Sequence, residues 1–106
     1  MQLADSTVHF AGFRCSVHLA RYRYAPDQIA IQLRDSDSGE PVATATVAVP
    51  EHALPSNHVL VKSYSENEGM LEALVAAGLV RDTGERVPSG HVRLAVCELL
   101  AAAPAA

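Results

Sequence analysis

One segment of this chain, residues 65–80, has the pattern of an amphipathic helix, whereas the rest is patterned as strands. Ser65 followed by Glu68 predicts a capping box, in which each side chain bonds the backbone N–H of the other residue. Gly78 suits the left-handed position that ends a helix, with Leu79 folding back onto Leu74. Apolar residues at spacings of three and four predict one buried face, made of Met70, Leu71, Leu74, Val75 and Gly78.

Alternation of apolar and polar side chains predicts the strands. They are expected at residues 13–24, 29–33, 42–49, 58–62 and 92–96. Proline lacks an N–H donor, so Pro26 and Pro50 are expected to end two of them, and the polar loop between the second and third strands makes a hairpin. Residues 82–84 and 88–90 are two turn signals before the last strand. We therefore expect an α+β fold, with an antiparallel sheet of about five strands and one main helix packed on one face.

The length of 106 residues fits a single domain, residues 1–106. Within it, residues 1–12 are expected to form a short strand or an arm, and the alanine-rich residues 101–106 a loose tail. One helix cannot cover a wide sheet. Part of the apolar face is therefore expected to depend on curvature of the sheet or on a partner.

The net charge and the lengths of the apolar runs bear on which partners the protein can bind and on where in the cell it is expected. Twelve acidic against eight basic residues give a net charge of −4, which argues against a protein that neutralises a nucleic-acid backbone. No apolar run approaches the ~18 residues of a membrane span, so no membrane partner is expected. Residues 1–5 lack the basic region that opens a secretory signal. We expect a cytoplasmic protein of the bacterial host.

No residue pattern indicates a catalytic centre, a metal or a cofactor. Cys15 and Cys97 lie far apart in predicted strands, where buried reduced thiols are more common than a disulfide or a nucleophile. The five histidines show none of the spacings typical of metal sites. Residues 35–39 (D-x-D-x-G) begin like a calcium loop, but the glycine is fifth rather than sixth. We expect a non-enzymatic protein; an enzyme that pairs a cysteine with a histidine is the least favoured alternative.

Two groups of charged residues are candidates for recognition. Acids gather at the helix start, at the turn after the helix and in the hairpin loop, where they can meet arginine or lysine on a partner. These candidate protein-binding residues are Asp35, Asp37, Glu40, Glu66, Glu72, Asp82 and Glu85. The second group interleaves basic and aromatic residues, as a nucleic-acid surface does: Arg14, Arg21, Tyr22, Arg23, Tyr24 and Arg34. Because the chain is acidic overall, ordinary exposed strand positions are the better interpretation of this second group.

Several segments resemble a family of small proteins carried by bacterial plasmids, phages and integrated elements. They are residues 64–71 (Y-S-E-N-E-G-M-L), 74–80, 83–84, 87–90 and 96–99, together with the hairpin residues 31–47. The family implies no activity of its own, but accessory proteins in this setting often block host defence. Length, acidity and lack of enzyme motifs are similar to those of anti-CRISPR proteins directed at type I systems. The resemblance thus implies an inhibitor that binds a host defence protein, such as a Cas subunit of Cascade or Cas3. The alternative is a nucleic-acid-associated accessory protein of a plasmid or phage.

Overall fold

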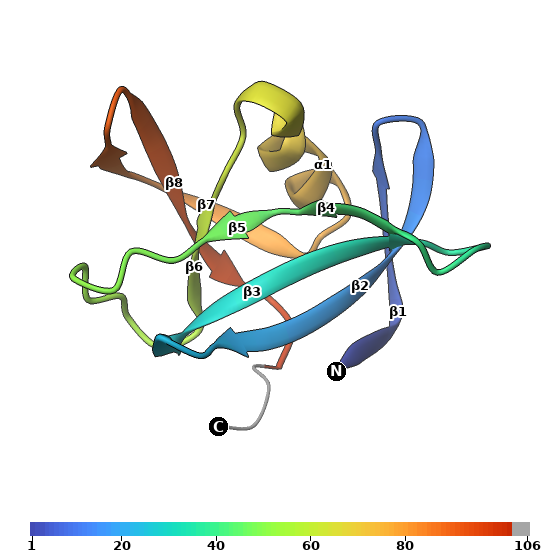
Figure 1. Cartoon of the computed structure of the whole chain (residues 1–106), viewed down its shortest axis with the longest axis horizontal. Helices are drawn as coiled ribbons and strands as arrows, with labels where there is room; N and C mark the ends of the chain where they lie inside the picture. The colour runs from blue at the N-terminus through green and yellow to red at the C-terminus, as the bar shows by residue number, and fades with distance from the viewer. Residues whose placement is uncertain (103–106) are drawn as a thin grey trace.

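The computed structural model describes residues 1–102, which form two antiparallel four-stranded sheets and one short helix (Figure 1). Sheet A contains, in spatial order, β1 (Gln2–Phe10), β2 (Phe13–Tyr22), β3 (Ala25–Asp35) and β4 (Pro41–Thr44). Sheet B contains β5 (Thr46–Val47), β6 (His58–Val61), β8 (Val92–Leu99) and β7 (Val80–Ser89). The α+β class and the antiparallel pairing are as predicted. The single sheet of about five strands is wrong, because the strands divide between two sheets.

The division occurs at Ala45, which interrupts the strand predicted over residues 42–49. The N–H of Ala45 donates to the carbonyl of Ile31 in β3 at 2.8 Å. The carbonyl of Ala45 accepts the N–H of Lys62, just after β6, also at 2.8 Å. As a result β4 pairs with β3, whereas β5 pairs with β6. One fully buried residue is therefore hydrogen-bonded to both sheets.

Two buried polar side chains hold this corner. The Thr46 hydroxyl accepts the backbone N–H of Ile31 at 3.1 Å and lies 2.9 Å from the hydroxyl of Tyr22. Gln28 ties the loop after β5 to β3: its amide donates to the carbonyls of Val49 (2.7 Å) and His52 (3.0 Å) and accepts the Val49 N–H (2.9 Å). Within residues 1–102, every buried side-chain nitrogen or oxygen has a hydrogen-bond partner. The corner is thus buried without the cost of an unsatisfied polar group.

The main core lies between the inner faces of the sheets and beneath α1 (Met70–Ala76). Met70 and Leu74 of the helix are fully buried in it. The helix contacts both β1 and β7, which are outer strands of the two sheets, and so covers the space between them (Figure 1). Leu60 and Leu94 belong to a smaller cluster that also contains Val87 and Val96. The second sheet therefore supplies cover for the apolar face that one helix cannot.

The helix begins later than its sequence predicts. Ser65–Asn67 form a separate 3-10 turn, and α1 starts only after Gly69, whose left-handed φ of 87° breaks the helical path. Neither Ser65 nor Glu68 caps α1, so the predicted capping box is wrong. Instead, the hydroxyl of Ser63 accepts the N–H of Leu71 at 3.0 Å.

The end of the helix agrees with its sequence. Gly78 has a φ of 72°, and the N–H of Leu79 donates to the Leu74 carbonyl at 3.1 Å. The N–H of Gly78 donates to the Val75 carbonyl at 3.0 Å, which completes a Schellman motif. Leu71 is half-buried, but Val75 is 44% exposed, which corrects its assignment to the buried face.

The structure also corrects several smaller predictions about strand and turn positions. The first residues form the long strand β1 rather than an arm, and Pro26 lies near the start of β3 rather than in a turn. The signal at residues 82–84 is a break in register within β7, not a turn between elements. Of the predicted tail, residues 103–106 lie outside the described part of the chain. Across residues 1–102, no helix has the length and apolar character needed to cross a membrane.

Replacing Thr46 with valine should destabilise the fold by about 1–3 kcal/mol, since it leaves the buried N–H of Ile31 without its acceptor. Thr44→Val is the matched control at an exposed position and should change the free energy of unfolding by less than about 0.5 kcal/mol. Urea denaturation of both variants measures the difference. Equal effects would contradict the role given to the Thr46 hydroxyl.

Candidate functional site

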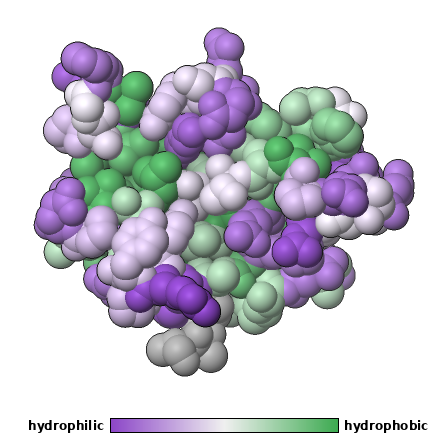
Figure 2. Space-filling model, viewed as in Figure 1, coloured by the Kyte–Doolittle hydropathy of each residue, from purple (hydrophilic) through white to green (hydrophobic). Residues whose placement is uncertain are grey.

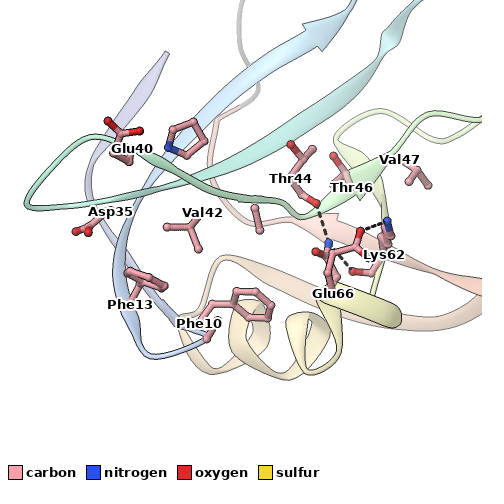
Figure 3. Close-up of a pocket in the computed structure, with 14 residues that line it drawn as sticks. Phe10, Phe13, Asp35, Glu40, Val42, Thr44, Thr46, Val47, Lys62 and Glu66 are labelled. Atoms are coloured by element: carbon pink, nitrogen blue, oxygen red, sulfur yellow. Dashed lines mark hydrogen bonds and ion pairs between the residues drawn. The ribbon is translucent and has the colours of Figure 1, made fainter.

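A cleft of about 530 Å³ opens between the β1–β2 hairpin and the bent strand β4–β5. The segment that follows β6 closes one end of the cleft, and the β3–β4 hairpin lies at the other (Figure 3). One wall comes from the β1–β2 hairpin of sheet A and the other from β4 of sheet A and β5 of sheet B, whereas the end at Lys62 and Glu66 belongs to the chain leaving sheet B. Because β4 and β5 meet at Ala45, the same corner that joins the sheets also sets the shape of this cleft.

The middle of the cleft is apolar. Phe10 and Phe13 face each other across a two-residue turn, in which Ala11 and Gly12 have positive φ values of 53° and 84°. In Figure 3 these two side chains lie on one side of the cleft and Val42 of β4 on the other. Phe10 is 8% exposed, but Phe13 is 46% exposed. On the face of the molecule that Figure 2 shows, apolar patches lie among hydrophilic residues.

Carboxylates lie at both ends of the apolar region. Asp35 and Glu40 stand at one end and Glu66 at the other (Figure 3). Glu66 forms an ion pair with Lys62, whose ammonium hydrogen-bonds to it and lowers the pKa of the carboxyl. The same contact raises the pKa of Lys62. Among the described residues, neither Asp35 nor Glu40 has a basic partner.

A buried asparagine holds the wall of the cleft in place. Asn67 is only 2% exposed, and its amide donates to the Thr44 carbonyl at 2.7 Å and to the Lys62 carbonyl at 3.2 Å. These bonds link the exposed edge of β4 to the chain that carries Glu66. The Glu66 end of the cleft is therefore held against β4.

The cleft gathers three of the seven acids predicted to bind a protein: Asp35, Glu40 and Glu66. The other four lie elsewhere. Asp37 is at the hairpin tip, with its N–H bonded to Asp35, and Glu72 is exposed on α1. Asp82 forms a two-pronged ion pair with Arg86, both contacts at 2.9 Å. The hydrogen bonds from Arg86 and from the Gly84 N–H lower the pKa of Asp82, and they engage its carboxylate within β7. Glu85 is exposed beside it.

The basic and aromatic residues proposed as a nucleic-acid surface do not form one stripe. Arg14 and Arg34 lie together on the outer face of sheet A, whereas Arg23 and Tyr24 occupy the turn between β2 and β3. The centroids of the Tyr22 and Tyr24 rings lie 5.8 Å apart, but the Tyr22 hydroxyl forms a hydrogen bond with Thr46. The side chain of Arg21 donates to the Pro26 carbonyl at 3.1 Å.

Arg14 and Arg34 belong to a second, shallower cleft of about 350 Å³ that also contains Ser16 and His18. The Ser16 hydroxyl lies 3.0 Å from His18 Nε2. The sequence places Arg14, Ser16 and His18 on one face of a strand by alternation. It does not show that Arg34 stands opposite Ser16, because that depends on the β2–β3 register.

The geometry gives little support to a nucleophilic cysteine or to catalysis by the Ser16–His18 pair. Cys15 and Cys97 are fully buried and form no disulfide. Burial raises the pKa of both thiols, that of Cys97 to about 11, whereas a nucleophilic cysteine needs an accessible thiolate. No carboxylate in residues 1–102 orients His18 as it would in a Ser-His-Asp triad. The same residues contain no group of three or more potential metal ligands.

Comparisons with protein-family models, curated proteins and solved structures found no match to this chain. Its function is therefore inferred from the arrangement of its own residues.

The His18 environment predicts a dependence of stability on pH. Burial first, then the positive charges of Arg34 and the N-terminus, lower the pKa of His18 below its ordinary 6.5. The unfolded chain therefore takes up a proton before the folded chain does, so stability declines as pH falls from 6.5 toward the folded-state pKa. Denaturation at several pH values should show a smaller decline in His18→Gln than in the unchanged protein. Identical slopes would contradict this prediction.

Proposed function

We propose that this chain is a non-enzymatic binding protein whose first cleft accepts a segment of a partner protein. The observation that carries the proposal is the order of side chains along the cleft: carboxylates, an apolar centre, then another carboxylate. A complementary segment has an apolar side chain in the middle and arginine or lysine on either side. Such a segment would bury Phe13 while its cations meet Asp35 and Glu40 at one end and share Glu66 with Lys62 at the other.

The apolar centre and the charged ends of the cleft are expected to contribute to binding in different ways. Large aromatic residues near the middle of an interface, shielded from water, supply most of its binding energy. Charges at the rim contribute more to the encounter rate and to the choice of partner. Phe13 is the exposed aromatic of the cleft, and the acids surround it. Asn67 and the Ala45 corner hold the cleft in shape, which lowers the entropy lost on binding.

The proposed partner is a host defence protein, as the resemblance to small mobile-element proteins implies. The best candidates are components of a type I CRISPR–Cas complex, Cascade or Cas3. Proteins that bind nucleic acid carry basic surfaces. An acid-lined cleft can occupy such a surface and exclude the nucleic acid by charge and by bulk.

A nucleic-acid-associated accessory protein is the second candidate function. It is supported by Arg14 and Arg34, neither of which forms an ion pair among the described residues. The dispersal of Arg23 and Tyr24 to the far turn and the net charge of −4 weaken it. Protein binding through the acidic cleft is therefore the better supported function.

Charge reversal inside and outside the cleft tests the leading proposal. Tagged protein is mixed with purified Cascade and with purified Cas3, and binding is measured at several salt concentrations. Glu40→Lys and Glu66→Lys should each weaken capture about ten-fold or more, because each substitution places a positive charge against a cation of the partner. Phe13→Ser should also weaken it. Glu72→Lys and Glu85→Lys are matched controls on exposed acids away from the cleft and should bind normally.

Thermal melting of each variant verifies that the fold is retained. Capture that is lost equally in all four charge variants would contradict the choice of surface. Failure of the unchanged protein to bind either complex would contradict the choice of partner.

A further inference from the structure

The second cleft lies on the outer face of sheet A and does not depend on the function proposed above. Arg14, Ser16 and His18 alternate along β2 with buried residues, so their side chains share the outer face. Arg34 of β3 stands directly opposite Ser16 in the antiparallel register. Arg34 is therefore flanked diagonally by Arg14 and His18. Gln2 and Thr7 of β1 complete the wall of this cleft.

This cleft concentrates positive charge without compensation by ion pairs. Lys62, Arg81 and Arg86 each form an ion pair with an acid. Within residues 1–102, Arg14 and Arg34 form none. The carboxylate in the cleft is Asp35, and it accepts the N–H of Asp37 at 2.9 Å. Arg14 and Arg34 are diagonal neighbours across the β2–β3 ladder, within reach of each other's long side chains, so one anion between them could contact both guanidinium groups.

The donors available match a group with several acceptor oxygens. Two guanidinium groups offer planar, paired N–H donors that suit phosphate oxygens. The hydroxyl of Thr7 and the amide of Gln2 add neutral donors around them. The Ser16 hydroxyl donates to the Arg34 carbonyl at 3.3 Å and lies 3.0 Å from His18 Nε2, so its role is to position His18 beside Arg34.

We propose that Arg14, Arg34, Ser16 and His18 form a binding site for a phosphate group. The group belongs either to a small phosphate monoester or to the diester backbone of a nucleic acid, which share this chemistry. The charged or titratable groups that surround it are Arg14, Arg34, His18, Asp35 and the N-terminus. An anion in the cleft would favour protonated His18, and binding should therefore strengthen as pH is lowered through the pKa of that residue.

NMR titration of the whole ¹⁵N-labelled protein tests the site. The probes are inorganic phosphate, a 5′-phosphorylated mononucleotide and a single-stranded oligothymidine without a terminal phosphate, all at constant ionic strength set with sodium chloride. Saturable shifts of the Ser16, His18 and Arg34 amides are expected. Arg14→Gln and Arg34→Gln should each weaken binding about ten-fold. Arg93→Gln, an exposed arginine of sheet B, is the matched control and should leave binding unchanged.

The probes separate the two sources of phosphate. Saturation by phosphate and the mononucleotide alone identifies a monoester site, whereas saturation by the oligothymidine identifies a backbone site. Ser16→Ala provides a second variant without loss of charge, and the amide spectrum of every variant verifies its fold. No saturable shift with any probe, or equal binding by the Arg14, Arg34 and Arg93 variants, overturns the proposal.

Discussion

The hydrogen bonds of the Ala45 backbone to Ile31 and Lys62 are the constraint on which the rest of the structure depends. They turn one continuous strand into β4 and β5 and thereby attach sheet A to sheet B. A side chain larger than alanine at this fully buried crossing would have to displace the backbones that meet there. Thr46 reinforces the crossing with its hydroxyl, which replaces a ladder bond that the bend removes from Ile31.

The molecule has two clefts with different chemistry, and Asp35 lines both of them. On one side, the bent strand forms the wall of an apolar cleft with Asp35, Glu40 and Glu66 at its ends. On the outer face of sheet A, the β2–β3 register places Arg34 beside Arg14 and His18. A chain of modest net charge thus carries one cleft lined by three acids and another lined by two arginines. Composition alone cannot reveal this separation, since the two charge groups largely cancel.

Local patterns predicted the elements of this fold better than their assembly. Alternation located β2, β3, β6 and β8, and Gly78 with Leu79 identified the helix end, because these features depend on neighbours in the chain. The break at Ala45 was missed because apolar–polar alternation continues across residues 42–49 while the partner strand changes. The capping box failed since Gly69 adopts a left-handed conformation between Ser65 and the helix, and Ser63, outside the motif, supplies the cap.

The candidate sites were predictable only in part for the same reason. Three of the acids that the sequence predicts to bind a protein, Asp35, Glu40 and Glu66, line one cleft, because the hairpin loop and the start of the helical segment lie at its two ends. Alternation predicts Phe13 and Val42 only as strand residues, because nothing local shows that a hairpin and a bent strand face each other across a cleft. Asp82 was assigned to recognition, but Arg86 four residues later neutralises it within β7.

Native-state hydrogen exchange tests the central claim most directly, because it reports how firmly each backbone amide is held. If the Ala45 crossing joins the sheets, the amides of Ala45 and Lys62 should exchange only through global unfolding, as slowly as those in the middle of β3 and β8. Rapid exchange of these two amides, with β3 and β8 still protected, would contradict the account. The two sheets would then be held together by side-chain packing alone.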